Sequence, residues 1–294
     1  MRARSSKSRR SFIVASILAA PALATAMSRV SQGSSARQLV DRIRTAFGPT
    51  WRETSTDTFH AGNPDTMVTG IATTVMSTLD VLQRAATARR NLVISHEPTF
   101  YTGNDDVTDL AADPTYLRKL AFIRENNLVV FRFHDNWHAR RPEPMGQGLA
   151  ELLGWGSMRS AAEPDVFVVP DTTVGGVAKL IEQRLGTRSY RVIGAATTVV
   201  RRIGFLPGTP PSATAASRLL PRVDLILAGE QREWEGVYYA YDTVTTGAAK
   251  AMITLGHAAS EDPGMKLCAD WLKTFISDVP VEWLPAGEPF TRMP

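Results

Sequence analysis

Helical and strand-like hydrophobic patterns alternate along the chain from residue 36 onward. From Ala36 to Phe47, apolar residues recur every three to four positions and form one face of a predicted helix. Short continuous apolar runs, such as Leu92 to Ser95, predict buried strands instead. Alternation of these two patterns is typical of an α/β fold in which most strands pair in parallel.

The other predicted elements follow the same alternation. We expect further helices at residues 79–90, 116–126, 148–153, 174–185, 213–220, 234–242 and 262–275. We expect further strands at 128–133, 166–169, 190–193, 203–206, 223–227 and 251–255, and a last edge strand at 281–284. The pattern therefore predicts mixed, mostly parallel sheets with helices on their faces, arranged as two pseudo-equivalent lobes.

The first 26 residues differ from this pattern. They combine a basic start, the pair Arg9-Arg10, an apolar stretch from Phe12 to Leu23, and small residues up to Ala26. These regions in this order predict a signal peptide, and the arginine pair resembles a twin-arginine signal. The alternatives are a disordered basic tail or a membrane anchor. We expect an exported protein, periplasmic or extracellular, with residues 27–35 as a linker.

The charge balance depends on this segment. The whole chain carries a formal net charge of +4, from 33 basic and 29 acidic residues. Residues 1–26 contain five basic and no acidic residues, so the rest has 28 against 29 and a net charge of −1. Such a balance argues against nucleic acid as a partner. After residue 26 no apolar run approaches the roughly 20 residues of a membrane span, so we expect none.

Four of the five histidines follow predicted strands: His96, His134, His138 and His257. Glu97, Glu230 and Glu261 lie near the same strand ends. Ligands of open α/β sheets bind beyond the carboxyl ends of the strands, and imidazole with carboxylate suits zinc, iron or manganese. A single histidine is more often structural, but four at equivalent places predict a metal site. The lone cysteine, Cys268, excludes a Cys-rich metal site and an intramolecular disulfide.

The spacing of the acidic residues supports two metals. His257 and Glu261 are four residues apart and share one helical face if the helix begins at the strand end. His96 and Glu97 are adjacent, so their side chains diverge, which suits two ions better than one. The alternative for Glu97 and Glu261 is an exposed carboxylate, or for Glu261 a place in the first helical turn.

Three blocks carry a resemblance to a known family. Residues 94–100 (ISHEPTF), 134–138 (HDNWH) and 256–261 (GHAASE) resemble the signature blocks of the NIF-three-like family, also called type-2 GTP cyclohydrolase I homologues. The resemblance covers roughly residues 36–294, which it identifies as the metal-binding domain. It implies a dinuclear metal site between the two lobes and ring-shaped hexamers.

The chain departs twice from the family pattern. Glu97 stands where the family has a second histidine, and His138 stands where it has an aspartate. The two changes offset each other, so the implied ligand set keeps three imidazoles and two carboxylates: His96, Glu97, His138, His257 and Glu261. The resemblance gives His134 a second-shell or acid–base role, with a satisfied buried histidine as the alternative. Glu230 could orient a ligand or a water.

These residues predict a centre of two divalent ions, Zn, Fe or Mn. Two such ions can activate water at neutral pH, so we expect a metal-dependent hydrolase acting on an unidentified small substrate, with His134 or Glu230 moving the proton. The rival interpretation is a non-catalytic protein for metal binding, storage or regulation. By resemblance we expect a homo-oligomer, a hexamer.

Overall fold

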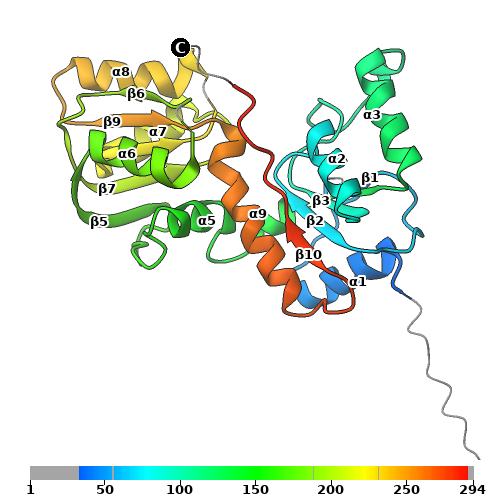
Figure 1. Ribbon diagram of the computed structural model, residues 1–294. Helices are drawn as coiled ribbons and strands as arrows, with labels where there is room; N and C mark the ends of the chain where they lie inside the picture. The colour runs from blue at the N-terminus through cyan, green and yellow to red at the C-terminus, as the bar shows by residue number, and fades with distance from the viewer. Residues whose placement is uncertain (1–32, 55, 188, 231, 291–294) are drawn as a thin grey trace, which may run out of the picture. The chain divides into compact units, whose positions relative to one another are not determined.

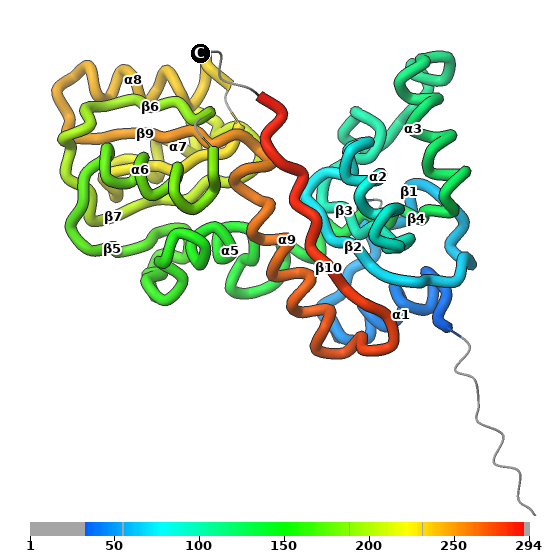
Figure 2. Tube along the Cα trace, in the orientation of Figure 1, coloured from blue at the N-terminus to red at the C-terminus, as the bar shows by residue number. Residues whose placement is uncertain are grey.

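The computed structural model describes residues 33–290, except for positions 55, 188 and 231. These residues belong to one compact unit with two five-stranded sheets (Figures 1 and 2). The predicted signal peptide, residues 1–26, lies outside the described residues, as does most of the predicted linker, residues 27–35. No helix in the described part of the chain combines the length and apolar character that a membrane span requires.

The first sheet has the strand order β1-β4-β3-β2-β10. Its members are β1 (Phe59–Ala61), β2 (Ile71–Thr74), β3 (Leu92–Ser95), β4 (Val129–Arg132) and β10 (Val281–Trp283). All neighbours pair in parallel except β1, which is antiparallel to β4. Every residue of β2, β3 and β4 is buried, which explains the apolar runs in β3 and β4.

Successive residues of these strands face different helices. Ile71, Ile94 and Phe131 pack with α1 (Ala36–Phe47) and α9 (His257–Lys273). Their neighbours Ala72 and Val93 pack with α2 (Leu79–Thr87) and α3 (Pro114–Glu125) on the opposite face. The alternation follows from the two-residue period of a strand.

The second sheet has the order β5-β7-β8-β9-β6. Its members are β5 (Val166–Thr173), β6 (Arg191–Ile193), β7 (Val199–Leu206), β8 (Leu225–Ala228) and β9 (Ala251–Thr254). β7, β8 and β9 are parallel, and the two edge strands are antiparallel to their neighbours. α5 (Pro144–Leu152) and α6 (Val174–Leu185) cover one face, and α7 (Ala213–Leu219) and α8 (Tyr238–Thr245) cover the other.

Helix α9 links the two sheets. It begins three residues after β9 of the second sheet and runs between the two sheets (Figure 1). Its buried residues Met265, Cys268 and Leu272 lie in the core of the first sheet. It also packs closely on α5: a Cβ atom on Gly148 would lie 2.5 Å from the backbone nitrogen of Gly264. Only glycine allows this approach, so the two helices hold the strand ends of both sheets near one another.

The sequence pattern predicted many of these elements well. The predicted bounds of α1, α6 and β3 match the structure, and Ser212 caps α7 by accepting a hydrogen bond from the backbone of Ala215. The two mixed, largely parallel sheets with helices on their faces confirm the predicted fold class.

Other predictions differ from the structure. β1, β2, the five-residue helix α4 (Asp135–Ala139) and the short turns Thr108–Leu110 and Leu220–Arg222 were not predicted. The predicted helix at 234–242 is a π-helical turn, Glu233–Val237, followed by α8. The predicted start of the last helix at Asp262 is wrong, because α9 begins at His257 and contains Pro263 in its interior. Gly256, with φ of 90°, ends β9 so abruptly that the helix starts at once.

Candidate metal centre

The short helix α4 presents two histidines at the end of β4. His134 precedes the helix and His138 lies one turn further on, with its backbone nitrogen bonded to the carbonyl of His134. The buried carboxylate of Asp57 accepts hydrogen bonds from the backbone nitrogens of His134, Asp135 and Asn136 at 2.7, 2.9 and 2.8 Å. It thereby satisfies the first turn of a helix too short to be stable alone.

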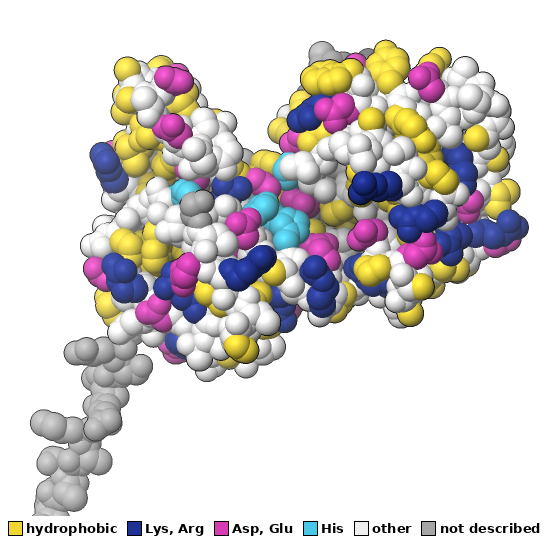
Figure 3. Space-filling model, turned by 180° about the vertical axis from the view of Figure 1, so that it is seen from behind, with side chains coloured by type: hydrophobic (Ala, Val, Ile, Leu, Met, Phe, Trp, Pro, Cys, Tyr) yellow, Lys and Arg dark blue, Asp and Glu magenta, His cyan; other side chains and the backbone are white. Residues whose placement is uncertain are grey.

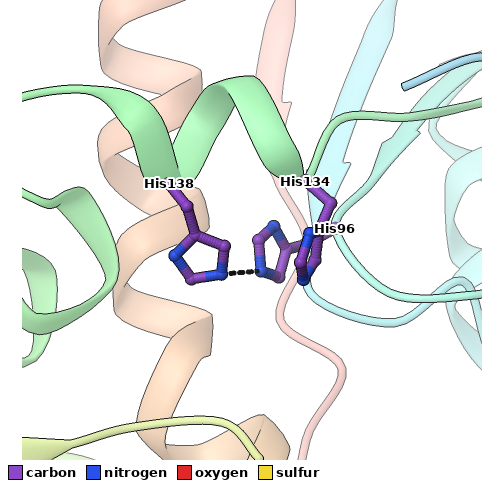
Figure 4. A group of neighbouring side chains, drawn as sticks. All are labelled: His96, His134 and His138. Atoms are coloured by element: carbon purple, nitrogen blue, oxygen red, sulfur yellow. Dashed lines mark hydrogen bonds between the residues drawn. The ribbon is translucent and has the colours of Figure 1, made fainter. Parts of the chain in front are cut away.

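His96 lies at the end of β3 and is completely buried. Its ring stacks on His134, with centroids 4.4 Å apart (Figure 4). Its Nε2 atom lies 3.1 Å from Nε2 of His138. Segments of β3 and α4 that are about forty residues apart in the sequence therefore bring three imidazoles together.

The adjacent Glu97 turns toward other partners. Its Oε2 accepts a hydrogen bond from Arg132 at 3.3 Å, and its Oε1 lies 3.1 Å from Nε2 of His257. Oε1 is also 3.6 Å from Nε2 of His134. The side chains of His96 and Glu97 therefore diverge, as expected of adjacent residues, but both border the same cluster.

Helix α9 contributes the remaining two residues. Because it begins at His257, Glu261 lies one turn later, and its Oε2 is 3.0 Å from Nε2 of His257 and 3.7 Å from Nε2 of His96. This Oε2 is buried and has no hydrogen-bond partner of acceptable geometry in the described residues. Gly208 makes room for the carboxylate, since a Cβ atom there would lie 2.3 Å from Oε1 of Glu261.

The rings of His96, His134, His138 and His257 are oriented in the same way. Each Nδ1 atom lies close to an oxygen acceptor, and each Nε2 atom faces the cluster. The Nδ1 contacts are His96 with the Phe133 carbonyl at 3.2 Å, His134 with Asp135 at 2.8 Å, His138 with Glu143 at 2.9 Å, and His257 with Glu230 at 2.7 Å. An acceptor at Nδ1 fixes the tautomer that leaves Nε2 free as a ligand, which is how metal-binding histidines are usually held.

The charges of the cluster are interdependent. Burial, together with the imidazoles of His138 and His134, lowers the pKa of His96 well below its usual value. Burial alone would lower the pKa of His257, but contacts with Glu261 and Glu97 raise it to about 11. Burial also acts to raise the pKa of Glu97, yet its hydrogen bond with His257 holds that pKa below the usual range. The carboxylates thus retain a proton on His257, and a divalent cation could take its place.

The donor set fits a metal. Two groups have ligand atoms all within 4.8 Å of one another: His96 with His134 and His138, and His96 with Glu97 and Glu261. Buried imidazoles and carboxylates suit zinc, iron or manganese, and Oε2 of Glu261, whose close neighbours are the Nε2 atoms of His257 and His96, is a ready acceptor for a cation. The cluster could therefore bind a metal ion.

The structure brings the predicted site residues together. All five predicted ligands lie in this cluster, and His134, predicted to lie behind them, shares one of the two groups. Glu230 contacts Nδ1 of His257. His60, the histidine away from predicted strand ends, pairs with Asp105 at 2.9 Å and belongs to neither group.

Sequence reasoning missed three supporting carboxylates: Asp57, Asp135 and Glu143. Glu143 also caps α5, accepting hydrogen bonds from the backbones of Met145 and Gly146. Its position before Pro144, which begins the helix, is a capping signal that could have been noticed. Asp57 carries no such signal, because it acts on a helix 77 residues further along the chain.

A cavity of about 430 Å³ opens beside the imidazoles. It is lined by Arg52, Glu53, Thr54, His134, Asp135 and His138. Figure 3 shows histidine side chains reaching the surface near the middle of one face, with acidic and basic side chains around them. A small molecule could therefore reach the cluster from solvent.

Comparisons with known proteins identify a relative and structures with the same fold. A GTP cyclohydrolase 1 type 2 homolog of Clostridium perfringens is 22% identical over 237 residues, covering 77% of this chain and 86% of the relative. A hypothetical protein of Staphylococcus aureus shares the fold, with a TM-score of 0.69 and 18% identity over 89% of this chain and 100% of the other. A Bacillus cereus protein related to NIF3 has a TM-score of 0.68 at 12% identity, over 90% of this chain and 100% of the other.

The family model covers nearly the whole described region. It matches residues 38–286 and confirms the resemblance that the three sequence blocks indicated. The chain belongs to the Duf34/NIF3 (NGG1p interacting factor 3) family.

Proposed function

We propose that this protein holds two divalent metal ions and is a metal-dependent hydrolase of a small substrate. The observation that carries the proposal is the orientation of the four histidines, whose Nδ1 atoms are occupied and whose Nε2 atoms face one cluster. Such an arrangement is costly to build and has little purpose in a hydrophobic core, but it preorganises metal ligands.

Two groups of side chains would hold the ions. His138 and His96 border the imidazole-rich part of the cluster, while Glu97, His257 and Glu261 border the carboxylate-rich part. The ligand atom of His96 also lies within 4.8 Å of those of Glu97 and Glu261, so His96 could contribute to either ion. When bound, divalent ions would supply Lewis acidity and lower the pKa of water toward 7.

The residues of the chain would supply binding and proton transfer. His134 lines the cavity, and the contact of its Nδ1 with Asp135 leaves Nε2 to accept a proton from the attacking water and return it to the leaving group. Glu230 is a positioning residue, because it acts through Nδ1 of His257. Arg132 holds Glu97 in place through its hydrogen bond to Oε2.

The cavity favours catalysis over storage. Its volume of about 430 Å³ lies in the range of small-molecule sites, and it directly adjoins His134 and His138. A storage or carrier site needs no such space for a second molecule. The alternative of a non-catalytic metal protein is therefore the weaker one.

We also propose that the protein is exported and forms a homo-oligomer. Residues 1–26 support export through a twin-arginine signal, and family membership supports a homo-oligomer, a hexamer. N-terminal sequencing of the protein recovered from the periplasm or medium tests the first point. Sedimentation equilibrium tests the second, with a monomer as the contrary result.

Metal content and turnover test the main proposal. The purified protein, loaded separately with Zn, Mn and Fe, should retain about two ions per chain by elemental analysis, and His257→Ala should retain fewer. His60→Gln is the matched control, since His60 lies outside the cluster. A screen of nitrophenyl esters, phosphates and cyclic amides should reveal turnover that a chelator abolishes and that His134→Ala lowers. Less than one ion per chain would contradict metal binding, and chelator-insensitive turnover would contradict the hydrolase.

A further inference from the structure

A second cavity, of about 470 Å³, lies on the α8 face of the second sheet. The register of β6 and β9 pairs Arg191 with Thr254 and Ile193 with Met252. Paired residues and those two positions away point to the same face, so these four side chains form a continuous floor. Val237, Tyr238 and Tyr241 stand opposite and form the wall.

The wall carries exposed aromatic rings. Tyr238 and Tyr241 are each 55% exposed, with ring centroids 6.1 Å apart and planes at 73°. Trp234, four residues before Tyr238 and on the other side of a backbone kink at Glu235, is 78% exposed but does not line the cavity. Aromatic rings usually bury most of their surface, so the two exposed tyrosine rings that line this concavity are a typical feature of a binding surface.

The floor contains an unsatisfied polar group. Thr254 is only 3% exposed, and its Oγ1 atom is buried without a hydrogen-bond partner in the described residues. A buried hydroxyl in this state costs free energy, so rotation of the Thr254 side chain that lets Oγ1 bond with a ligand atom would remove a penalty already present in the free protein. At the rim, Arg191 and Glu233 form an exposed ion pair at 3.0 Å and offer both a donor and an acceptor.

We propose that this cavity binds a small planar aromatic molecule that carries a polar ring atom or substituent. Tyr238 and Tyr241 would contact the ring faces, Thr254 would bond to a polar ring atom or substituent, and the Arg191–Glu233 pair would contact polar groups at the opening. A purely apolar partner would leave the Thr254 hydroxyl unsatisfied. A flat protein surface would not fill the concavity.

The cavity lies close to the metal cluster in the fold. Thr254 precedes His257 by three residues, and three Cα steps of about 3.8 Å limit their separation to roughly 11 Å. Both therefore lie at the carboxyl ends of the parallel strands of the second sheet, where α/β proteins bind ligands. The cavity has its own polar and aromatic groups, so binding does not require a metal.

Ligand-observed NMR on the metal-free protein tests the proposal. Benzamide, nicotinamide and adenine should receive saturation transfer, whereas cyclohexanecarboxamide, which has the same amide on a saturated ring, should receive none. Tyr241→Ala should weaken binding at least about tenfold, and Tyr241→Phe, which keeps the ring, should not. Thr254→Val should weaken binding severalfold. Thr254→Ser keeps the hydroxyl and should bind as tightly as the unsubstituted protein.

Three results would overturn the proposal. The first is equal binding of benzamide and its saturated counterpart. The second is unchanged affinity in Tyr241→Ala and Thr254→Val, with folding of both variants checked by circular dichroism. The third is sedimentation showing that Tyr241→Ala dissociates an oligomer, which would assign the surface to contacts between copies. The NMR samples contain a chelator, so this test does not depend on metal binding. A protein that binds no metal but binds nicotinamide would refute the proposed hydrolase and leave this inference intact.

Discussion

The Nε2 atoms of His96 and His138 face each other at 3.1 Å. The Nδ1 atom of each ring lies beside an acceptor, the carbonyl of Phe133 for His96 and the carboxylate of Glu143 for His138. Two neutral imidazoles held in this way would point their lone pairs at each other. A cation between them resolves the conflict, and either a proton or a metal ion can fill that role.

Metal affinity should therefore increase with pH. Burial acts to lower the pKa of His138, but its hydrogen bond with Glu143 raises it overall, and the pKa of His257 is raised to about 11. At pH 7 the metal-free protein holds the proton of His257, which a metal bound at Nε2 must displace, and the raised pKa of His138 acts in the same direction. Calorimetric titration with Zn²⁺ should show tighter binding at pH 8 than at pH 6 and net proton release in buffers of different ionisation enthalpy. Equal affinity at both pH values would contradict this.

Glu230→Gln should weaken metal binding. The change removes the charge that holds Nδ1 of His257, and loss of such a partner typically costs about 10–100-fold in metal affinity. Competition with a chromophoric chelator measures the effect. Glu235→Gln is the matched control on the same segment, since Glu235 pairs with Arg232 and not with a histidine. A similar loss in both variants would show that the segment as a whole, rather than this contact, is responsible.

Gly208→Ala should displace Glu261. The new Cβ atom would lie 2.3 Å from Oε1 of Glu261, at a backbone φ of 74° that also disfavours alanine. We expect about 1–3 kcal/mol of lost stability and weaker metal binding. Gly186→Ala separates the two effects, because Gly186 has φ of 68° with nothing near the added atom. That variant should lose stability in urea unfolding while its metal content is unchanged. Retention of metal by Gly208→Ala would count against Glu261 as a ligand.

Lys119 should make stability rise at alkaline pH. Burial lowers its pKa to about 8, below the roughly 10.4 of an unfolded lysine. The unfolded state therefore binds more protons between these values, so the free energy of unfolding should increase by about 2–3 kcal/mol as pH rises through that window. Lys119→Met should remove the rise in urea unfolding between pH 7 and 10.5. Lys266→Met, at an exposed lysine, should keep it; an unchanged rise in Lys119→Met would assign it to another group.

Local sequence was sufficient for elements whose stability is local. α1 and α6 have one apolar face and polar caps, Ser35 and Thr173, within their own segments. The chemistry of the site was also readable, since histidines and glutamates at the ends of buried parallel strands share one edge of a sheet. Glu143 was the residue that a capping signal could have added.

Other features had no local signal. Helix α4 depends on Asp57, which lies outside its own segment and accepts hydrogen bonds from its first turn. The start of α9 was hidden by Pro263, which is usual near a helix start but here lies inside the helix. The gap that Gly208 leaves for Glu261 joins segments 53 residues apart, so nothing near either residue indicates it.

The sequence by itself thus determined the α/β class, most of the helices and strands, and the set of residues able to bind a metal, because periodicity, capping and side-chain chemistry act over a few residues. Only the tertiary structure decided that β3, α4 and α9 meet at one point and which nitrogen of each histidine faces it. Those outcomes depend on acceptors such as the Phe133 carbonyl and Glu230, placed by the packing of α9 between the sheets. A ring orientation is a property of its surroundings, and those surroundings exist only once distant segments have packed together.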